Sequence, residues 1–239
     1  MVARSLRPSR PRKQHGPAFR IGWFIGRLIV WFLVLSVGVT LLYKVVPVPF
    51  TATMLMDDNG FTRDWTSLES IDRNVIDAVI AGEDGKFCAH DGFDREAIAT
   101  AALKNLKGGR IRGGSTISQQ TAKNVFLWQG GGYFRKALEA WFTLLIEQVW
   151  GKRRIMEVYL NVAETGIGTY GVEAGAQRYY RKGAARLSRV EAARLAAALP
   201  APKKRAVTGA SGFTRRHGNT IAARIGVVRR EGLDSCVYG

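Results

Sequence analysis

The sequence predicts a mostly α-helical domain that follows a single N-terminal transmembrane helix. Three observations predict it. An apolar segment near the N-terminus is preceded by a basic stretch. From residue 66 onward, apolar residues recur at helical spacing almost to the end, and no run of alternating apolar and polar residues indicates a strand. About 190 residues follow the apolar segment, which is enough for one hydrophobic core.

The segment 21–43 is apolar apart from Arg27 and is long enough to cross a bilayer. At 1.5 Å per residue it spans about 34 Å, against about 30 Å of hydrocarbon. The stretch 1–20 is predicted to be a disordered tail with six basic residues and no acidic one, whereas Lys44 alone follows the segment directly. This asymmetry predicts a single-pass protein of the inner (cytoplasmic) membrane with its domain in the periplasm. No small-residue cleavage site follows the segment, so an uncleaved anchor is expected.

The net charge of +17 indicates an anionic partner, which can be nucleic acid, a membrane surface or a phosphorylated ligand. The predicted export of the domain argues against nucleic acid, because the domain would not meet it. Residues 44–64 are predicted to be a linker with a turn at Asp58-Asn59-Gly60, and residues 65–239 are predicted to form the domain.

Two adjacent carboxylates, Glu83 and Asp84, follow a predicted helix over 71–80. Glycine is expected to end this helix near Ala81-Gly82, which leaves the pair on a short bent segment. That position suits a general base, because a general base needs fixed geometry more than a long rigid element. A solvated acidic turn is the alternative interpretation.

A polar helix is predicted after the flexible pair Gly113-Gly114, with Ser115 or Thr116 as its N-cap. The free N–H groups of such a helix end form an anion site. Thr116, Gln120 and Lys123 are spaced i, i+4 and i+7, so a hydroxyl, an amide and an ammonium share one face. This face suits sugar hydroxyls and a phosphate. A polar face turned to solvent is the alternative.

Arg135, Lys136 and Glu139 lie within one turn at the start of an apolar helix that runs to Trp150. Two cations and a carboxylate can hold a pyrophosphate, either directly or through a divalent metal that Glu139 and the phosphate share. A surface ion-pair set is the alternative. The aromatic, glycine-rich loop 127–134 before this helix either packs on the core or rests on a bilayer.

The remaining elements follow from helical spacing and from caps. They are a helix over 95–106 with Asp94 as N-cap, a helix over 152–161, a glycine loop over 166–171, a helix over 172–180, a helix from the capping box Ser188–Glu191 to Leu199, and a last helix over about 215–231.

The two cysteines, Cys88 and Cys236, both lie in the part of the chain that is predicted to be exported. An oxidising compartment permits a disulfide between them, which would tie the C-terminal tail beside the carboxylate segment. Two unpaired thiols are an equally supported alternative, and the sequence does not choose between them.

Four stretches in order resemble the motifs of the peptidoglycan glycosyltransferases, glycosyltransferase family 51. They are Glu83-Asp-x-x-Phe87-x-x-His90-x-Gly92, Gly113-Gly-Ser-Thr-Ile-x-Gln-Gln120 with Lys123-Asn124, Arg135-Lys-x-x-Glu139, and Ile155-x-Glu157-x-Tyr-Leu-Asn161. The resemblance covers about residues 65–205. Neither Ser-x-x-Lys nor Lys-Thr-Gly occurs, so the chain is similar to the monofunctional members without a penicillin-binding module.

The resemblance implies a lysozyme-like α fold with a small hydrophobic region apposed to the bilayer. It implies polymerisation of lipid II on a growing lipid-linked glycan, with β-1,4 linkage and release of undecaprenyl diphosphate. Moenomycin is the expected inhibitor, and proteins of cell division or elongation are candidate partners. Lytic cleavage of glycan, as in lysozymes, and a non-enzymatic membrane-anchored scaffold are the rival interpretations.

By the same resemblance, Glu83 is the general base for the acceptor 4-hydroxyl. Lys123, Arg135, Lys136 and Glu139 match positions that stabilise the diphosphate, with Glu139 also counted as catalytic and as the ligand of an expected Mg²⁺ or Mn²⁺. The matching substrate-binding positions are Ser115, Thr116, Gln120 and Asn124, together with Asp84 and His90 in a supporting role.

Overall fold

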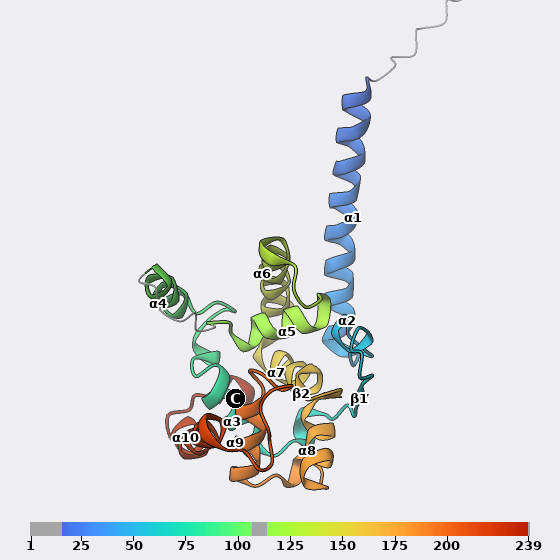
Figure 1. Cartoon of the computed structure of the whole chain (residues 1–239). Coiled ribbons are helices and arrows are strands. Elements are labelled where there is room, and N and C mark those ends of the chain that lie inside the picture. Colours follow the sequence, from blue (N-terminus) through green and yellow to red (C-terminus); the bar gives the residue numbers. More distant parts are fainter. Residues whose placement is uncertain (1–15, 107–113, 239) are drawn as a thin grey trace, which may run out of the picture. The chain divides into compact units, whose positions relative to one another are not determined.

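The computed structural model describes residues 16–106 and 114–238 (Figure 1). The chain divides into two compact units, one that ends at Val39 and one that begins at Thr40. The first element is helix α1, Pro17–Val45. Its part Ala18–Val45 has a mean hydropathy of 2.2 and is long and apolar enough to cross a membrane. The described part of the chain therefore contains the single span that the sequence predicts.

The second unit is mostly helical, as predicted, and contains one small sheet. Its longer helices are α3 (Arg73–Glu83), α4 (Arg95–Leu106), α5 (Ile117–Phe126), α6 (Gly132–Val149), α7 (Gly151–Val162), α8 (Val172–Tyr180), α9 (Arg189–Ala198) and α10 (Gly212–Arg230). The shorter elements are helices α2 (Ala52–Leu55) and α11 (Ser235–Tyr238), 3-10 helices η1 (Leu68–Ser70), η2 (Phe87–Ala89) and η3 (Ala184–Arg186), and strands β1 (Thr62–Arg63), β2 (Glu164–Gly166) and β3 (Thr169–Tyr170).

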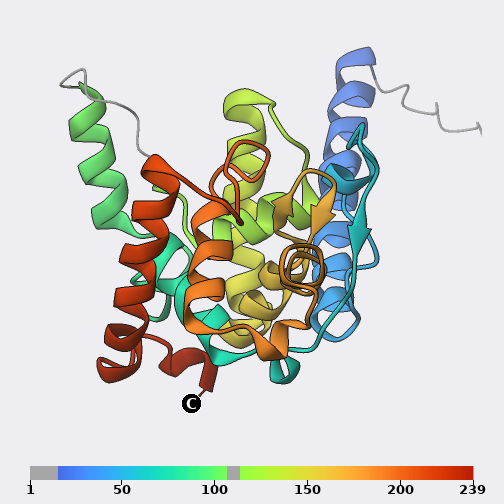
Figure 2. The same ribbon diagram turned by 60° about the horizontal axis from the view of Figure 1, so that its bottom comes forward.

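Helix α3 is packed on both α9 and α10, and α5 is packed on α6 and α7. Figure 2 shows α9 and α10 side by side. Ile76 and Ile80 of α3 are fully buried in the core. A Cβ atom at Gly82 would lie 2.9 Å from Cδ1 of the buried Ile221, so a larger residue there would force the side chain of Ile221 to shift. The core therefore fixes the C-terminal end of α3.

The three short strands correct one part of the sequence analysis. Residues 166–171 are predicted to be a glycine loop, but β2 and β3 form an antiparallel pair and β1 joins β3 in parallel. Thr62 pairs with Thr169, far away in the sequence. Strands of two or three residues are too short to show an alternating pattern, so the sequence carried no signal for them.

The segment 44–64 is also more ordered than a linker. Thr51 caps α2 by accepting a hydrogen bond from the Met54 N–H (3.3 Å), and both Val48 and Met54 are buried. Arg63 donates to the carbonyl oxygens of Val48 and Pro49. These contacts join the segment to the core, because extended backbone can bury isolated side chains without any periodic pattern.

Candidate active site

Glu83 is the last residue of α3 and not part of a bent segment after it. The helix is predicted to end near Ala81-Gly82, but the N–H of Asp84 still donates to the Ile80 carbonyl (3.2 Å), which carries the helix through Glu83. The carboxylate is therefore held at the end of a rigid, packed element.

The two carboxylate oxygens of Glu83 have different surroundings. Oε2 accepts a hydrogen bond from Nε2 of Gln120 (3.0 Å). Oε1 is buried and has no hydrogen-bond partner among the described residues. Burial raises the pKa of Glu83 above its ordinary value, against the Gln120 hydrogen bond and the charges of Arg205 and Lys123, which lower it. Glu83 is thus a stronger base than an ordinary glutamate. Its Oε1 accepts no hydrogen bond from the described residues.

A cavity of about 560 Å³ lies along α5, and Glu83 is not among the residues that line it. The predicted residues Gln120, Lys123 and Asn124 all contribute to its wall, and Gln120 also contacts Glu83. The rest of the wall is Thr53, Met56, Asp57, Gln129, Tyr159, Val162, Ala163, Glu164, Tyr170, Leu199, Pro200, Pro202 and Lys203.

Arg135, Lys136 and Glu139 meet as predicted. Nη1 of Arg135 lies 2.7 Å from Oε2 of Glu139, and Lys136 donates to Oε1 of the same carboxylate. Glu139 is only 2% exposed, so this is a partly buried cluster and not a surface ion-pair set. We call these three residues the cationic cluster, since they carry a net charge of +1.

Lys123 joins the cationic cluster to Glu83. Burial lowers the pKa of Lys123, as do the charges of Arg135 and Lys136, whereas the charges of Glu139 and Glu83 raise it. The ammonium is therefore within electrostatic reach of both carboxylates. The base and the cations are thus coupled electrostatically through Lys123.

The cationic cluster does not form a metal site by itself. Glu139 is its only carboxylate, and cations occupy both of its oxygens. The described residues contain no group of three His, Cys, Asp or Glu side chains that could hold a metal. An ion at Glu139 would fit only if a phosphorylated ligand supplied further oxygens.

Asp84 and His90 face each other and not the cavity. Nε2 of His90 lies 3.0 Å from Oδ1 of Asp84, and the N–H of Gly92 donates to Nδ1 (3.1 Å). Nδ1 therefore accepts, so Nε2 carries the proton and donates to Asp84. Asp84 and His90 are predicted to have a supporting role, and in the structure their contact stabilises the segment after α3.

The N-terminus of α5 binds a carboxylate of the protein itself. The Ile117 N–H donates to Oδ2 of Asp84 (2.9 Å), so the predicted anion site is already filled. Thr116 is the N-cap, in a capping box with Gln119, and its hydroxyl donates to the Gly92 carbonyl (2.7 Å). Thr116 is therefore structural and not sugar-binding.

Ser115 is exposed, and its carbonyl oxygen lies 3.5 Å from Nε2 of Gln120. Gly114 is described, but Gly113 lies outside the described residues, as do residues 1–15 of the predicted tail.

Two residues with a part in the site had no predicted role. Tyr159 of α7 donates from its hydroxyl to Oε1 of Gln120 (3.3 Å). Arg205 follows α9, donates to the Ala197 carbonyl (3.0 Å), and lowers the pKa of Glu83 through its charge. Tyr159 falls inside the fourth of the motifs that resemble the family, so its position in the sequence could have identified it as a site residue. Nothing in the local sequence marks Arg205.

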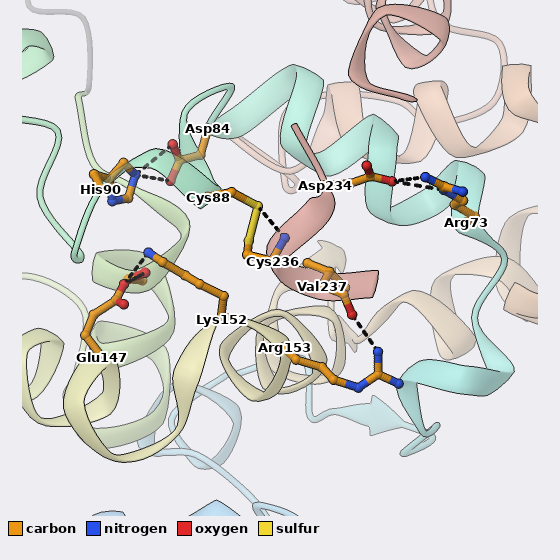
Figure 3. The surroundings of a disulfide bond; sticks show 11 residues. Arg73, Asp84, Cys88, His90, Glu147, Lys152, Arg153, Asp234, Cys236 and Val237 are labelled. Atoms are coloured by element: carbon orange, nitrogen blue, oxygen red, sulfur yellow. Dashed lines mark hydrogen bonds and ion pairs between the residues drawn. A yellow bond between two sulfur atoms is a disulfide. The ribbon is translucent and has the colours of Figure 1, made fainter. Parts of the chain in front are cut away.

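Cys88 and Cys236 form a disulfide, one of the two alternatives left open by the sequence (Figure 3). Cys88 belongs to η2, between Asp84 and His90, and Cys236 belongs to α11. Nη1 of Arg153 also contacts the C-terminal segment, by donating to the Val237 carbonyl (2.6 Å). The disulfide thus ties α11 to the segment beside Glu83.

Residues 51–225 match the family model described as Transglycosylase. This match covers well over half of the chain, so the chain belongs to the transglycosylase family. The resemblance noted in the sequence is thereby confirmed, and with it the lysozyme-like helical fold class.

Three similar proteins carry the same name within this family. A biosynthetic peptidoglycan transglycosylase of Caulobacter vibrioides is 47% identical over 228 residues, which cover 91% of this chain and 100% of the relative. Proteins of the same name from Pseudomonas putida and Pasteurella multocida are 46% and 45% identical, over 87% of this chain and 89% and 88% of their own lengths.

Proposed function

We propose that this chain is a peptidoglycan glycosyltransferase, which polymerises lipid II into β-1,4-linked glycan strands and releases undecaprenyl diphosphate. One observation carries the proposal beyond family membership. Glu83, whose Oε1 has no hydrogen-bond partner among the described residues, interacts electrostatically with Lys123, and Lys123 interacts in the same way with the cationic cluster. A base beside a cationic pocket suits attack on a sugar whose leaving group is a diphosphate.

In this mechanism, Oε1 of Glu83 takes the proton from the 4-hydroxyl of the acceptor N-acetylglucosamine. The acceptor oxygen then attacks C1 of the donor N-acetylmuramic acid from the face opposite the diphosphate, so the α linkage becomes β. The C1–O bond to the diphosphate breaks, and Lys123, Arg135 and Lys136 stabilise the charge that develops there. A general base contributes about 10²–10⁴-fold, and fixed cations are the larger expected contribution.

A divalent metal is a separate part of the proposal. Mg²⁺ or Mn²⁺ would be shared between Glu139 and the diphosphate oxygens, where it would neutralise phosphate charge. Glu139 supplies one protein ligand, and its present partners Arg135 and Lys136 would then turn toward the diphosphate.

The location of the reaction is also proposed. The apolar helix α1 would anchor the chain in the inner membrane, with its N-terminus in the cytoplasm and the domain in the periplasm. Exposed apolar side chains at Tyr133 and Phe134 of α6 support a region that rests on the bilayer, where a polyprenyl substrate stays. Proteins of cell division or elongation are proposed partners.

Glycan cleavage, the first rival, needs an acid and a second carboxylate or a water, but no cations for a diphosphate. The buried carboxylate of Glu139 with its two cations favours synthesis instead. A scaffold, the second rival, would need no base with a free oxygen, so the surroundings of Glu83 argue against it.

The test is incubation of the purified full-length protein with labelled lipid II in detergent, with and without moenomycin. We expect long glycan products and free undecaprenyl diphosphate, and we expect moenomycin to suppress both. Consumption of isolated cell-wall glycan with no use of lipid II would instead establish the hydrolase.

Replacing Glu139 by Gln keeps the side-chain shape but removes the charge that orients Arg135 and Lys136. We expect kcat to fall about 10-fold or more, since each lost charge-assisted contact weakens stabilisation of the leaving group. We expect no rise in KM for lipid II, because the pocket becomes more cationic. Steady-state kinetics at several Mg²⁺ concentrations measure both constants.

The matched control is Glu69→Gln, which removes an exposed carboxylate paired with Arg153. This control should keep normal kinetics. An unchanged kcat and an unchanged response to Mg²⁺ in Glu139→Gln would remove Glu139 from the site.

A further inference from the structure

A chain of two hydrogen bonds links three helices at the candidate base. The hydroxyl of Tyr159 on α7 donates to Oε1 of Gln120 on α5 (3.3 Å). Nε2 of the same amide donates to Oε2 of Glu83 on α3 (3.0 Å). Gln120 therefore uses its acceptor end for one partner and its donor end for the other.

A glutamine side chain can present either end of its amide to a neighbour, because the two orientations have nearly the same shape. If the amide of Gln120 turned over, its oxygen would face the carboxylate of Glu83. Two acceptors would then meet, and the contact would be favourable only with Glu83 protonated. The orientation of one amide thus decides which form of the base is stabilised.

Tyr159 is the group that distinguishes the two orientations. It is 1% exposed, and burial raises the pKa of its hydroxyl well above the ordinary value, so the hydroxyl keeps its proton. Among the described residues, Gln120 is the one side chain to which this hydroxyl donates. Turning the amide over would leave a buried O–H without an acceptor, which is costly.

We propose that Tyr159 is a positioning residue for glycan transfer: its hydroxyl holds the amide of Gln120 with the N–H group toward Glu83. In this arrangement Oε2 of Glu83 is occupied by Gln120, and Oε1 alone is left to receive the proton of the acceptor. The inference rests on the proposed function, and it adds a residue that does not touch the substrate's reacting atoms.

The test is Tyr159→Phe, which keeps the ring and removes one hydroxyl. We expect kcat/KM for lipid II to fall about 10-fold at neutral pH, as is typical for a lost hydrogen bond that supports a charged group. We expect the acid limb of the kcat/KM profile to move to higher pH, because the freed amide can now stabilise protonated Glu83. The rate should recover toward the wild-type value at alkaline pH.

Two further variants separate positioning from packing. Tyr180→Phe deletes a partly buried hydroxyl that contacts the Glu191 carbonyl and does not line the cavity, and its pH profile should match that of the wild type. In a Gln120→Ala background, Tyr159→Phe should have no additional effect, since Tyr159 acts through Gln120.

Several results would overturn the inference. An unshifted acid limb in Tyr159→Phe, additive effects of the two substitutions, or failure of Tyr159→Phe to fold would each make Tyr159 a packing residue only. These outcomes leave the proposed function intact when the wild type still polymerises lipid II. A wild type that does not use lipid II would contradict the proposed function instead.

Discussion

Glu83→Gln is expected to abolish polymerisation of lipid II and to leave the protein folded. The amide keeps the shape of the side chain and can still bond to Gln120, but it cannot take a proton from the acceptor hydroxyl. Loss of a general base costs about 10²–10⁴-fold, which brings the rate below detection in most assays. Formation of labelled glycan, with circular dichroism as the check on folding, measures both properties.

The same variant should not be less stable than the wild type. Burial raises the pKa of Glu83, so the folded state binds the proton more tightly than the unfolded state. Stability then falls as the pH rises through the raised pKa, because the ionised form is the one that burial disfavours. Glu83→Gln removes this cost, and its melting temperature at neutral pH should equal or exceed that of the wild type. A lower melting temperature would give Glu83 a structural role.

Removing the disulfide is expected to have the largest effect on stability. The bond joins residues 148 positions apart, and closing a loop of this length stabilises the folded state by up to about 5 kcal/mol in the chain-entropy account. We expect Cys88→Ser/Cys236→Ser to lose about 2–5 kcal/mol in free energy of unfolding. Urea denaturation of the full-length protein in detergent, oxidised and after treatment with a dithiol, measures this loss.

Reduction of the wild type should lower its stability by about as much as the double substitution, and a dithiol should not affect the double variant. The segment keeps other contacts, since Phe87 is fully buried and Asp84 still meets His90. Activity well below the melting temperature should therefore persist in the variant. Equal stability with and without the bond would show that α11 is held by other contacts alone, such as the guanidinium of Arg73 over the ring of Tyr238 and the Arg153 hydrogen bond to Val237.

Regular features of the fold were predictable from the sequence. The helix over 172–180 and the capping box Ser188–Glu191 agree with the structure, because helical periodicity and caps are local signals. The cationic cluster was predictable for the same reason, since its members lie within one helical turn. The strands were not, because two or three residues show no alternating pattern, and the partner of β1 lies more than a hundred residues away.

The roles of Asp84, His90 and Thr116 could not be read from residue types. Each has the chemistry to bind a sugar, but tertiary contacts with Ile117 and Gly92 use that chemistry inside the protein. Spacing along a helix gives the face on which a side chain lies and not the group that it meets. The part of Tyr159 depends in the same way on a contact between helices.

The pH dependence of lipid II polymerisation tests the central claim most directly. If Glu83 is the base and burial raises its pKa, kcat/KM of the wild type should fall as the pH drops through a value above the ordinary 4.5 of glutamic acid. Glu83→Gln should show no polymerisation at any pH in this range. A wild-type rate that stays constant down to pH 4.5, or polymerisation by Glu83→Gln at any of these pH values, would contradict the account.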